Sequence, residues 1–234
     1  MSSFSLRLIA LLTMFIDHTG LTLFPNIGIF RCVGRLSFPL YCFLLVQGYM
    51  HTRSLRAYAR RLLLLALLSE IPFDFLIFGR HSSGAEQNVL FSLLLGLCAV
   101  YAADTLRGRP VQALLAAATL CMGAMAARVS YGWLGVALCL CAYYAGTNKM
   151  HLALSFGCAL LIYTLSLLLS GVAKSWVLVS LCALVSLPLL LCYNGRRGVR
   201  LPLISFLFYA AYPLHLLALV FLRALRIIPP YFLQ

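Results

Sequence analysis

Apolar runs, each about as long as a membrane span, follow one another along almost the whole chain. Gly, Pro and charged residues separate the runs, and roughly 20 consecutive apolar residues suffice for a helix to cross a bilayer. The pattern predicts about nine transmembrane helices (range 8–10), near 6–24, 36–51, 61–78, 88–106, 111–128, 131–147, 150–170, 174–193 and 202–222. We therefore expect an all-α, polytopic helical bundle in which residues 1–234 form a single membrane domain.

The composition agrees with this pattern and restricts where chemistry can occur. The 234 residues are 63% hydrophobic and 10% charged, with a mean hydropathy of +0.99, whereas soluble domains are about half apolar. The connections are too short for a soluble catalytic domain, so any reaction must take place within the bundle. The nine cysteines lie mostly in apolar runs without C-x-x-C spacing, which favours small buried hydrophobes over disulfides or metal ligands.

The basic residues predict the orientation of the bundle. Lys and Arg total 18 and the net charge is +13, and these residues cluster between the apolar runs. Cytoplasmic loops of membrane proteins are enriched in Lys and Arg. An N-terminus inside places 11 of the 18 in the cytoplasm and 7 outside, so we predict an N-in, C-out protein of a bacterial inner membrane and no binding to nucleic acid.

Polar residues interrupt several of the predicted helices, and their depths agree. Asp17 and His18 lie within the first span, where an Asp costs roughly 2.5–3.5 kcal/mol of insertion free energy and usually marks a functional site. In the N-in topology, the other polar residues fall in the same middle-to-outer layer: Arg35, Glu70, Asp74, Asn88, Tyr131, Tyr209, Tyr212 and His215. We expect one polar cavity that opens toward the extracytoplasmic side; a purely structural ion pair or helix–helix hydrogen bond is the alternative.

Helix geometry limits which of these groups can pair. Glu70 and Asp74 are four residues apart and share a helix face, so either a cation neutralises them or one carboxyl keeps its proton. Asp17 and His18 are adjacent and point about 100° apart. We therefore expect Glu70 or Asp74 to orient His18 and Asp17 to hold Arg35. Glu70 could instead serve only to hold the bundle together.

Two further features could carry chemistry. His215 follows Pro213, whose ring removes a helical hydrogen bond and kinks the last span within the polar layer. On the predicted cytoplasmic side lies a basic cluster, Arg53, Arg56, Arg60, Arg61, Arg196 and Arg197. This cluster either reflects topology and contact with anionic membrane lipid or binds the phosphates of a cytosolic ligand, because Arg matches phosphate oxygens.

Motifs ordered along nearly the whole chain resemble those of the TraX family. They include Ile16-Asp17-His18-Thr19-Gly20, Gly34-Arg35-Leu36-Ser37-Phe38-Pro39, Gly48-Tyr49-Met50-His51-Thr52-Arg53, Ser69-Glu70-Ile71-Pro72-Phe73-Asp74, Gln87-Asn88-Val89, Tyr131-Gly132-Trp133-Leu134-Gly135-Val136, Asn194-Gly195-Arg196-Arg197-Gly198 and Phe208-Tyr209-Ala210-Ala211-Tyr212-Pro213-Leu214-His215-Leu216. Any one of them is weak, but together they are specific. The family is named for a conjugation protein that acetylates the N-terminus of F-pilin, and it resembles the broader class of membrane acyltransferases.

The resemblance implies an acyl-CoA-dependent acetyltransferase with His18 as the catalytic histidine, and Asp17, Arg35, Glu70 and His215 around it. The donor would be acetyl-CoA, whose phosphates rest on the cytoplasmic arginines while the pantetheine arm threads inward. The acceptor would be an amine or hydroxyl reached from outside, such as a pilin-like peptide. His18 would act as general base or form an acyl-His18 intermediate. Arg35, Tyr209 or Asn88 would stabilise the oxyanion, with Asp74, Tyr131 and Tyr212 as further substrate contacts.

Two other classes of function stay open. A transporter or proton-coupled exporter would use Asp17, Glu70 and His215 as a relay, but the sequence shows no internal repeat of the kind found in transporters. A membrane assembly scaffold would use the polar residues only for packing. No metal is expected, because the carboxylates and histidines come from separate helices without a ligand pair such as H-E-x-x-H.

Overall fold

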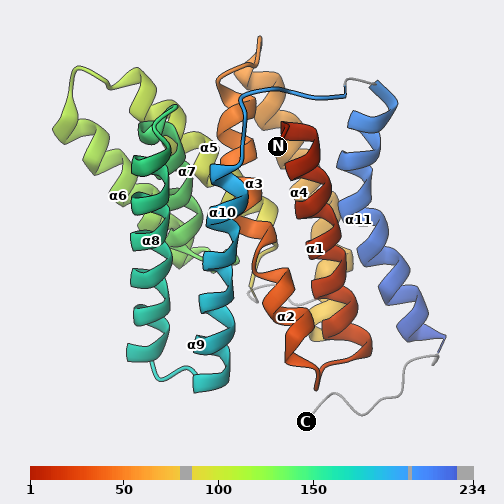
Figure 1. Cartoon of the computed structure of the whole chain (residues 1–234). Helices are drawn as coiled ribbons and strands as arrows, with labels where there is room; N and C mark the ends of the chain where they lie inside the picture. The colour runs from red at the N-terminus through yellow and green to blue at the C-terminus, as the bar shows by residue number, and fades with distance from the viewer. Residues whose placement is uncertain (80–85, 200–201, 226–234) are drawn as a thin grey trace.

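The protein is a bundle of helices joined mainly by short loops (Figure 1). The computed structural model describes residues 1–79, 86–199 and 202–225. Its helices are α1 (Ser3–Leu23), α2 (Gly28–Gly34), α3 (Ser37–Tyr49), α4 (Leu55–Phe78), α5 (Val89–Thr105), α6 (Pro110–Ala126), α7 (Trp133–Ala145), α8 (Lys149–Leu169), α9 (Lys174–Leu181), α10 (Ser186–Leu191) and α11 (Pro202–Ala224), with the 3-10 turn η1 (Cys182–Val185) between α9 and α10.

Local sequence explains where these helices begin and end. Side chains that accept a hydrogen bond from the first turn cap α1, α4, α5 and α8, and these N-caps are Ser2, Ser54, Asn88 and Asn148. α6 begins at Pro110, which cannot donate a backbone hydrogen bond and loses nothing at a first helical position. α4 ends at Gly79, whose φ of 70° lies in the left-handed region that glycine adopts without strain.

The helix lengths and composition identify a membrane protein. Five helical segments among the described residues are long and apolar enough to cross a membrane: Ser3–Leu23, Gly28–Tyr49, Lys149–Leu169, Lys174–Leu191 and Leu207–Ala224. α5, α6 and α7 are apolar but shorter. The prediction of an all-α membrane bundle is therefore confirmed for the part of the chain that the structure describes.

Three predicted spans differ in detail from the observed helices, and one of them, expected at 61–78, begins earlier as α4 (Leu55–Phe78). The other two differ in their regularity. The second was expected at 36–51, but helix starts earlier, at Gly28, and is interrupted at Arg35 and Leu36 between α2 and α3. The apolar residues of α3 allow its position to be predicted from the sequence. The charged residues Arg31 and Arg35 made the segment that forms α2 resemble a loop between two spans. The span expected at 174–193 consists of α9, η1 and α10 rather than one regular helix.

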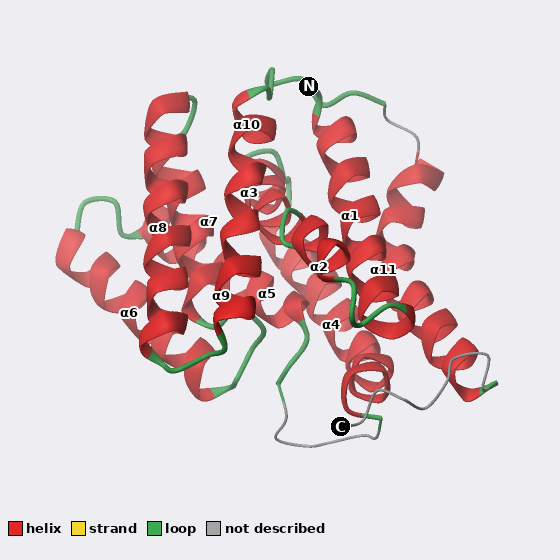
Figure 2. Ribbon diagram, turned by 60° about the horizontal axis from the view of Figure 1, so that its bottom comes forward, coloured by secondary structure: helices red, strands yellow, loops and turns green. Residues whose placement is uncertain are grey.

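Successive spans alternate in direction, so the loops gather at two ends of the bundle. We call the end that carries Met1 and the loops at 50–54, 106–109, 146–148 and 192–199 the N-terminal face. The opposite face carries the loops after α1, α6 and α8 (Figures 1 and 2). α7 packs against α3, α5, α6 and α8, while α1 packs against α2, α3 and α11, and α11 also packs against α4.

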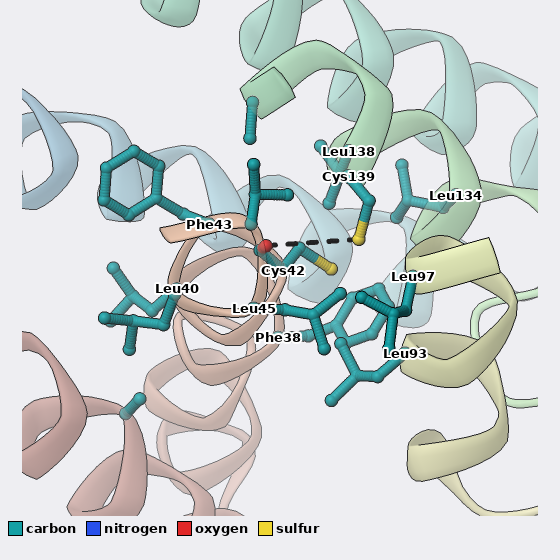
Figure 3. Packing of buried hydrophobic residues seen from close by; sticks show 14 of the residues in the cluster. Phe38, Leu40, Cys42, Phe43, Leu45, Leu93, Leu97, Leu134, Leu138 and Cys139 are labelled. Atoms are coloured by element: carbon teal, nitrogen blue, oxygen red, sulfur yellow. Dashed lines mark hydrogen bonds between the residues drawn. The ribbon is translucent and has the colours of Figure 1, made fainter. Parts of the chain in front are cut away.

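An apolar layer fills the interior between α3, α5 and α7. Figure 3 shows the side chains of this layer, which include Phe38, Leu40, Cys42, Phe43, Leu45, Leu93, Leu97, Leu134, Leu138 and Cys139. Cys42 and Cys139 are fully buried and free, and the Cys139 thiol lies 4.0 Å from the Cys42 carbonyl oxygen. Small residues let the helices approach, since a Cβ at Gly96 would collide with Cys139.

Polar contacts fasten the same three helices at the N-terminal face. Asp104 on α5 accepts hydrogen bonds of 2.6 Å from Tyr49 on α3 and from Tyr143 on α7. Arg107 pairs with the same carboxylate at 2.9 Å and donates to the Tyr143 hydroxyl.

Three of the 18 basic residues that were used to predict the orientation, Arg80, Arg200 and Arg226, lie outside the described residues.

Candidate active site

A cavity of about 380 Å³ lies between the middle of the bundle and the opposite face. α1, α2, α3, α4, α5, α7, α8, α9, η1 and α11 all contribute to its wall. The polar and aromatic residues that line it include Asp17, His18, Arg31, Arg35, Glu86, Ser130, Tyr131, Tyr163, Trp176 and Tyr212. The cavity therefore collects ionisable side chains from segments that are far apart in the sequence.

Asp17 and Arg31 form an ion pair on one side of this cavity. Arg31 Nη1 lies 2.9 Å from Asp17 Oδ1, and the two side chains are 15% and 14% exposed. A Cβ at Gly34 would collide with the Asp17 side chain, so the missing side chain allows α2 to approach α1 at this point. We expected Asp17 to pair with Arg35, and this is wrong, because Asp17 forms its ion pair with Arg31.

Arg35 lies against aromatic side chains. Its Nη1 donates a 2.9 Å hydrogen bond to the Tyr131 hydroxyl. Its Cζ atom is 5.6 Å from the Tyr131 ring centroid and 5.9 Å from that of Trp176, and the Cζ of Arg31 is 5.4 Å from the same Trp176 ring. Both guanidinium groups therefore make cation–π contacts with Trp176.

The backbone at Tyr131 is held in a conformation that is unfavourable for a residue with a side chain. Its φ is 65°, in the left-handed region, which costs about 1–2 kcal/mol for a non-glycine residue. Two backbone hydrogen bonds of 2.9 Å connect Gln87 with Arg128 and Ser130 just before it, and the Tyr131 ring stacks on Phe38 at 4.0 Å. Strain that the surroundings maintain in this way is frequent at functional sites.

His18 pairs with His215. The Nδ1 of His18 lies 2.6 Å from the Nε2 of His215, and the two rings stack at 4.9 Å with an interplanar angle of 12°. The Nδ1 of His215 lies 2.8 Å from the carbonyl oxygen of Ala211, one turn earlier in α11. The expectation that Glu70 or Asp74 would orient His18 is therefore wrong, whereas His215 lies beside His18.

With both rings neutral, this chain of contacts determines where their protons lie. The Ala211 carbonyl can only accept a hydrogen bond, so Nδ1 of His215 carries a proton and its Nε2 is an acceptor. The Nδ1 of His18 must then donate to His215, which leaves the Nε2 of His18 without a proton. No hydrogen bond to this Nε2 is found among the described residues, and the ring lines the cavity. His18 thus offers a basic nitrogen to whatever occupies the cavity.

Tyr212 provides a free donor next to this histidine. Its ring centroid is 6.3 Å from that of His18, in an edge-to-face arrangement. The residue is 5% exposed and lines the cavity, and its buried hydroxyl has no hydrogen-bond partner within the described part of the chain. Buried hydroxyls are rarely left unpaired, so this hydroxyl can donate to a ligand once a movement of the side chain exposes it to the cavity.

Glu70 and Asn88 form a separate contact between α4 and α5. The Glu70 carboxylate accepts hydrogen bonds from the backbone N–H and the side-chain Nδ2 of Asn88, and that amide also donates to the Ala66 carbonyl. The oxygen of the Asn88 amide caps α5. Neither residue is among those that line the cavity. The donors of Asn88 are engaged, so the expected oxyanion role of Asn88 is not supported.

Other predicted residues also lie away from the cavity lining. Asp74 is 2% exposed, and Tyr209 is 38% exposed on α11. Six exposed arginines, Arg53, Arg56, Arg60, Arg61, Arg196 and Arg197, lie at or near the N-terminal face. The described cavity does not reach that face, and the apolar layer of Figure 3 occupies the interior around α3, α5 and α7.

The structure adds residues that the sequence pattern did not single out. Arg31, Trp176 and Tyr163 line the cavity. The four-residue spacing of Arg31 and Arg35 was a usable signal, because it places them on one face of a helix. Nothing in the apolar segment around Trp176 distinguishes it from an ordinary buried or lipid-facing aromatic residue.

The fold and cavity define a helical membrane protein with a polar site inside the bundle, and comparison with known proteins gives its family. The model of the TraX protein family matches residues 2–223. The chain therefore belongs to the TraX family.

Individual relatives extend this assignment. A probable fimbrial assembly protein, FimC of serogroup H1 from Dichelobacter nodosus, is 30% identical over 92% of this chain and 93% of its own length. An uncharacterized protein of Rickettsia prowazekii (strain Madrid E) is 30% identical over 41% of this chain and 35% of its own length. No solved structure matches the chain.

Proposed function

We propose that this protein is an acyltransferase of the bacterial inner membrane that modifies an acceptor reached from the extracytoplasmic side. In this proposal nine spans cross the membrane with the N-terminus inside, so that the N-terminal face is cytoplasmic and the cavity opens outward. The observation that carries the proposal is the His18–His215–Ala211 chain of contacts beside the cavity, which in the neutral pair leaves Nε2 of His18 able to act as a base.

The transfer step uses His18 as a general base. Its Nε2 removes a proton from an acceptor amine or hydroxyl while the acceptor atom attacks the carbonyl carbon of an acyl thioester. A new C–N or C–O bond forms, the C–S bond breaks, and the departing sulfur receives the proton from His18. The products are the acylated acceptor and a free thiol. An acyl-His18 intermediate would give the same products in two steps.

Two cavity residues support this step. His215 accepts the Nδ1 hydrogen bond of His18 and stabilises the positive charge that develops on the ring. Tyr212, whose ring lies beside His18 and whose buried hydroxyl is unpaired in the described part of the chain, turns this hydroxyl into the cavity and donates to the oxygen of the tetrahedral intermediate. Removing one such donor typically costs about 10²–10³-fold in kcat.

Acetyl-CoA is the simplest donor. Its phosphates would bind the arginines of the N-terminal face, including Arg60 and Arg61. Its acyl arm must then pass the apolar layer between that face and the cavity, so the proposal requires this layer to open a route for the donor. Glu70 and Asn88 hold α4 and α5 together in this mechanism rather than acting on the substrate, and the buried Asp74 takes no part in the transfer.

Purified protein in lipid nanodiscs tests the proposal. With radiolabelled acetyl-CoA and inner-membrane extract as the source of acceptors, we expect CoA-dependent transfer of label that falls by about 10²–10⁴-fold in His18→Ala, the contribution typical of a general base. His151→Ala is the matched control, since His151 is exposed at the start of α8, outside the cavity. Equal transfer by wild type and His18→Ala would refute the role of His18.

A second candidate is an assembly factor without catalytic activity. The observation that favours it is the similarity to the probable fimbrial assembly protein along nearly the whole length of both chains. In this case the polar residues would only pack the bundle, and pilus assembly in cells would survive His18→Ala while requiring correctly folded protein. Scoring assembly and acyl transfer in the same variants separates the two candidates.

A further inference from the structure

Two arginines and two carboxylates line the cavity, namely Arg31, Arg35, Asp17 and Glu86. Asp17 forms its ion pair with Arg31 rather than with Arg35. His18 and His215 add no charge when both rings are neutral. Glu86 also lines the cavity, but it is exposed and begins the segment leading into α5 at the opposite face. The charge of Arg35 is therefore not neutralised by any carboxylate within salt-bridge distance in the described structure.

Arg35 keeps most of its hydrogen-bonding capacity. A guanidinium has five N–H donors in a planar fork, and one hydrogen bond from Arg35, to Tyr131, is found among the described residues. The rings of Tyr131 and Trp176 hold the group in place. A planar, pre-positioned fork with free donors matches the two oxygens of a carboxylate.

We propose that Arg35 binds a carboxylate which the acceptor carries close to the amine or hydroxyl that is acylated. This inference rests on the proposed function and names its acceptor class. It assigns Arg35 to acceptor binding, while Tyr212 remains the oxyanion donor. The cavity of about 380 Å³ is near the lower end of the roughly 300–1,000 Å³ typical of ligand sites, which suits a peptide end better than a lipid with its acyl chains.

Trp176 gives a direct way to measure this binding without any acyl donor. The chain has two tryptophans, and Trp133 does not line the cavity, so Trp133→Phe leaves Trp176 as the sole indole reporter. In this background we would titrate two peptides, Ala-Glu-amide and Ala-Gln-amide, which differ by one carboxylate. We expect saturable change in Trp176 fluorescence with at least tenfold tighter binding of Ala-Glu-amide.

Variants of Arg35 decide whether this residue causes the preference. Arg35→Gln should bind both peptides equally. Arg35→Lys, which keeps the charge but loses the fork, should keep a reduced preference for Ala-Glu-amide and provides the test if Arg35→Gln does not fold. Lys149→Gln, an exposed change at the N-terminal face, should leave the preference unchanged. Circular dichroism and size-exclusion chromatography check that each variant is folded.

Three results would overturn the inference: equal binding of the two peptides by the parent, an undiminished preference in Arg35→Gln, or tighter binding of inorganic phosphate than of Ala-Glu-amide. The last result would assign the subsite to a phosphate group instead. Because no thioester is present, this outcome is separate from the transfer assay. Carboxylate preference without acyl transfer would refute the proposed function and leave Arg35 as a carboxylate-binding subsite for another ligand, whereas acyl transfer without carboxylate preference would refute only this inference.

Discussion

At the scale of single residues, the proposed reactivity of the cavity depends on the pairing of His18 with His215. A histidine in an apolar bundle has two neutral forms, and only one of them presents Nε2 as a base. Here the choice depends on Ala211, whose carbonyl can only accept a hydrogen bond. A backbone atom on α11 thus determines the proton position on a side chain of α1.

We expect His215→Ala to lower kcat of acyl transfer by about 10–10²-fold with little change in KM, because the variant loses the acceptor that fixes the His18 ring while the cavity wall stays in place. His215→Gln should restore much of the rate, since its amide oxygen can accept from Nδ1 of His18. Steady-state kinetics of both variants make the comparison. If Gln and Ala at this position behave alike, His215 does not act through that hydrogen bond.

The double variant tests whether the two histidines act as a unit. Once His18 is alanine, the loss of His215 should cost almost nothing further, because its role is exerted through His18. Independent, multiplicative losses would mean that His215 contributes in some other way.

At the scale of helices, the contact between α1 and α2 determines where the charged groups lie. α2 is short, and its approach to α1 places Arg31 against Asp17. Gly34 makes that approach possible, since any Cβ there would meet the Asp17 carboxylate. At the other end of this contact, Gly20 of α1 accommodates Phe30 in the same manner.

Gly34→Ala should therefore separate the two helices and destabilise the protein by about 1–3 kcal/mol, the usual cost of overpacking. Gly28→Ala is a matched control in the same helix, because a Cβ at Gly28 meets nothing within 4 Å. Thermal unfolding of the detergent-solubilised variants compares them. An unfolding midpoint for Gly34→Ala equal to that of Gly28→Ala would show that the contact relaxes without cost.

Hydropathy predicted the helices well but not their interruptions. The apolar runs of α1, α8 and α11 are each bounded by charges or turn residues, so length and composition suffice to locate them. α2 carries Arg31 within seven residues, and its helical state depends on packing against α1. That packing is a tertiary effect which no local pattern shows.

The site was predictable in its depth but not in its pairings. The depth of a residue follows from its position along a span, and His18, Arg35, Tyr131 and Tyr212 do line one cavity. The rotation of each helix about its axis and the choice of neighbour are set by packing over the whole bundle. For that reason the contact between His18 and His215, which are 197 residues apart in the sequence, could not be predicted from the positions of the spans. The same holds for Glu70, whose carboxylate binds Asn88 rather than His18.

At the scale of the whole molecule, exposed arginines lie at one face of the bundle and the polar cavity lies toward the other. The N-terminal face presents exposed arginines at the start of α4 and in the segment after α10. The cavity lies toward the other face, with the apolar layer occupying much of the interior in between. In the proposed reaction the acyl donor binds at the N-terminal face and the acceptor enters the cavity from the other side of the membrane.

The orientation is therefore the property on which the proposed acyl transfer depends, and labelling from one side of the membrane tests it. Glu86 and Lys149 are both exposed, Glu86 at the opposite face and Lys149 at the N-terminal face. In a background where every cysteine except the fully buried Cys42 and Cys139 is replaced by alanine, Glu86→Cys and Lys149→Cys each supply one accessible thiol. The outer membrane is permeabilised first, so that a membrane-impermeant maleimide reaches the outer side of the inner membrane.

With the N-terminus inside, as the excess of basic residues on that side indicates, we expect Glu86→Cys to react in such cells and Lys149→Cys to react only after the inner membrane is disrupted. The reverse pattern would place the cavity toward the cytoplasm. A transferase of that orientation would draw donor and acceptor from the same compartment, and the arginines of the N-terminal face could then take no part in binding CoA. Reaction of both thiols in intact inner membranes would instead contradict the alternation of spans between Lys149 and Glu86.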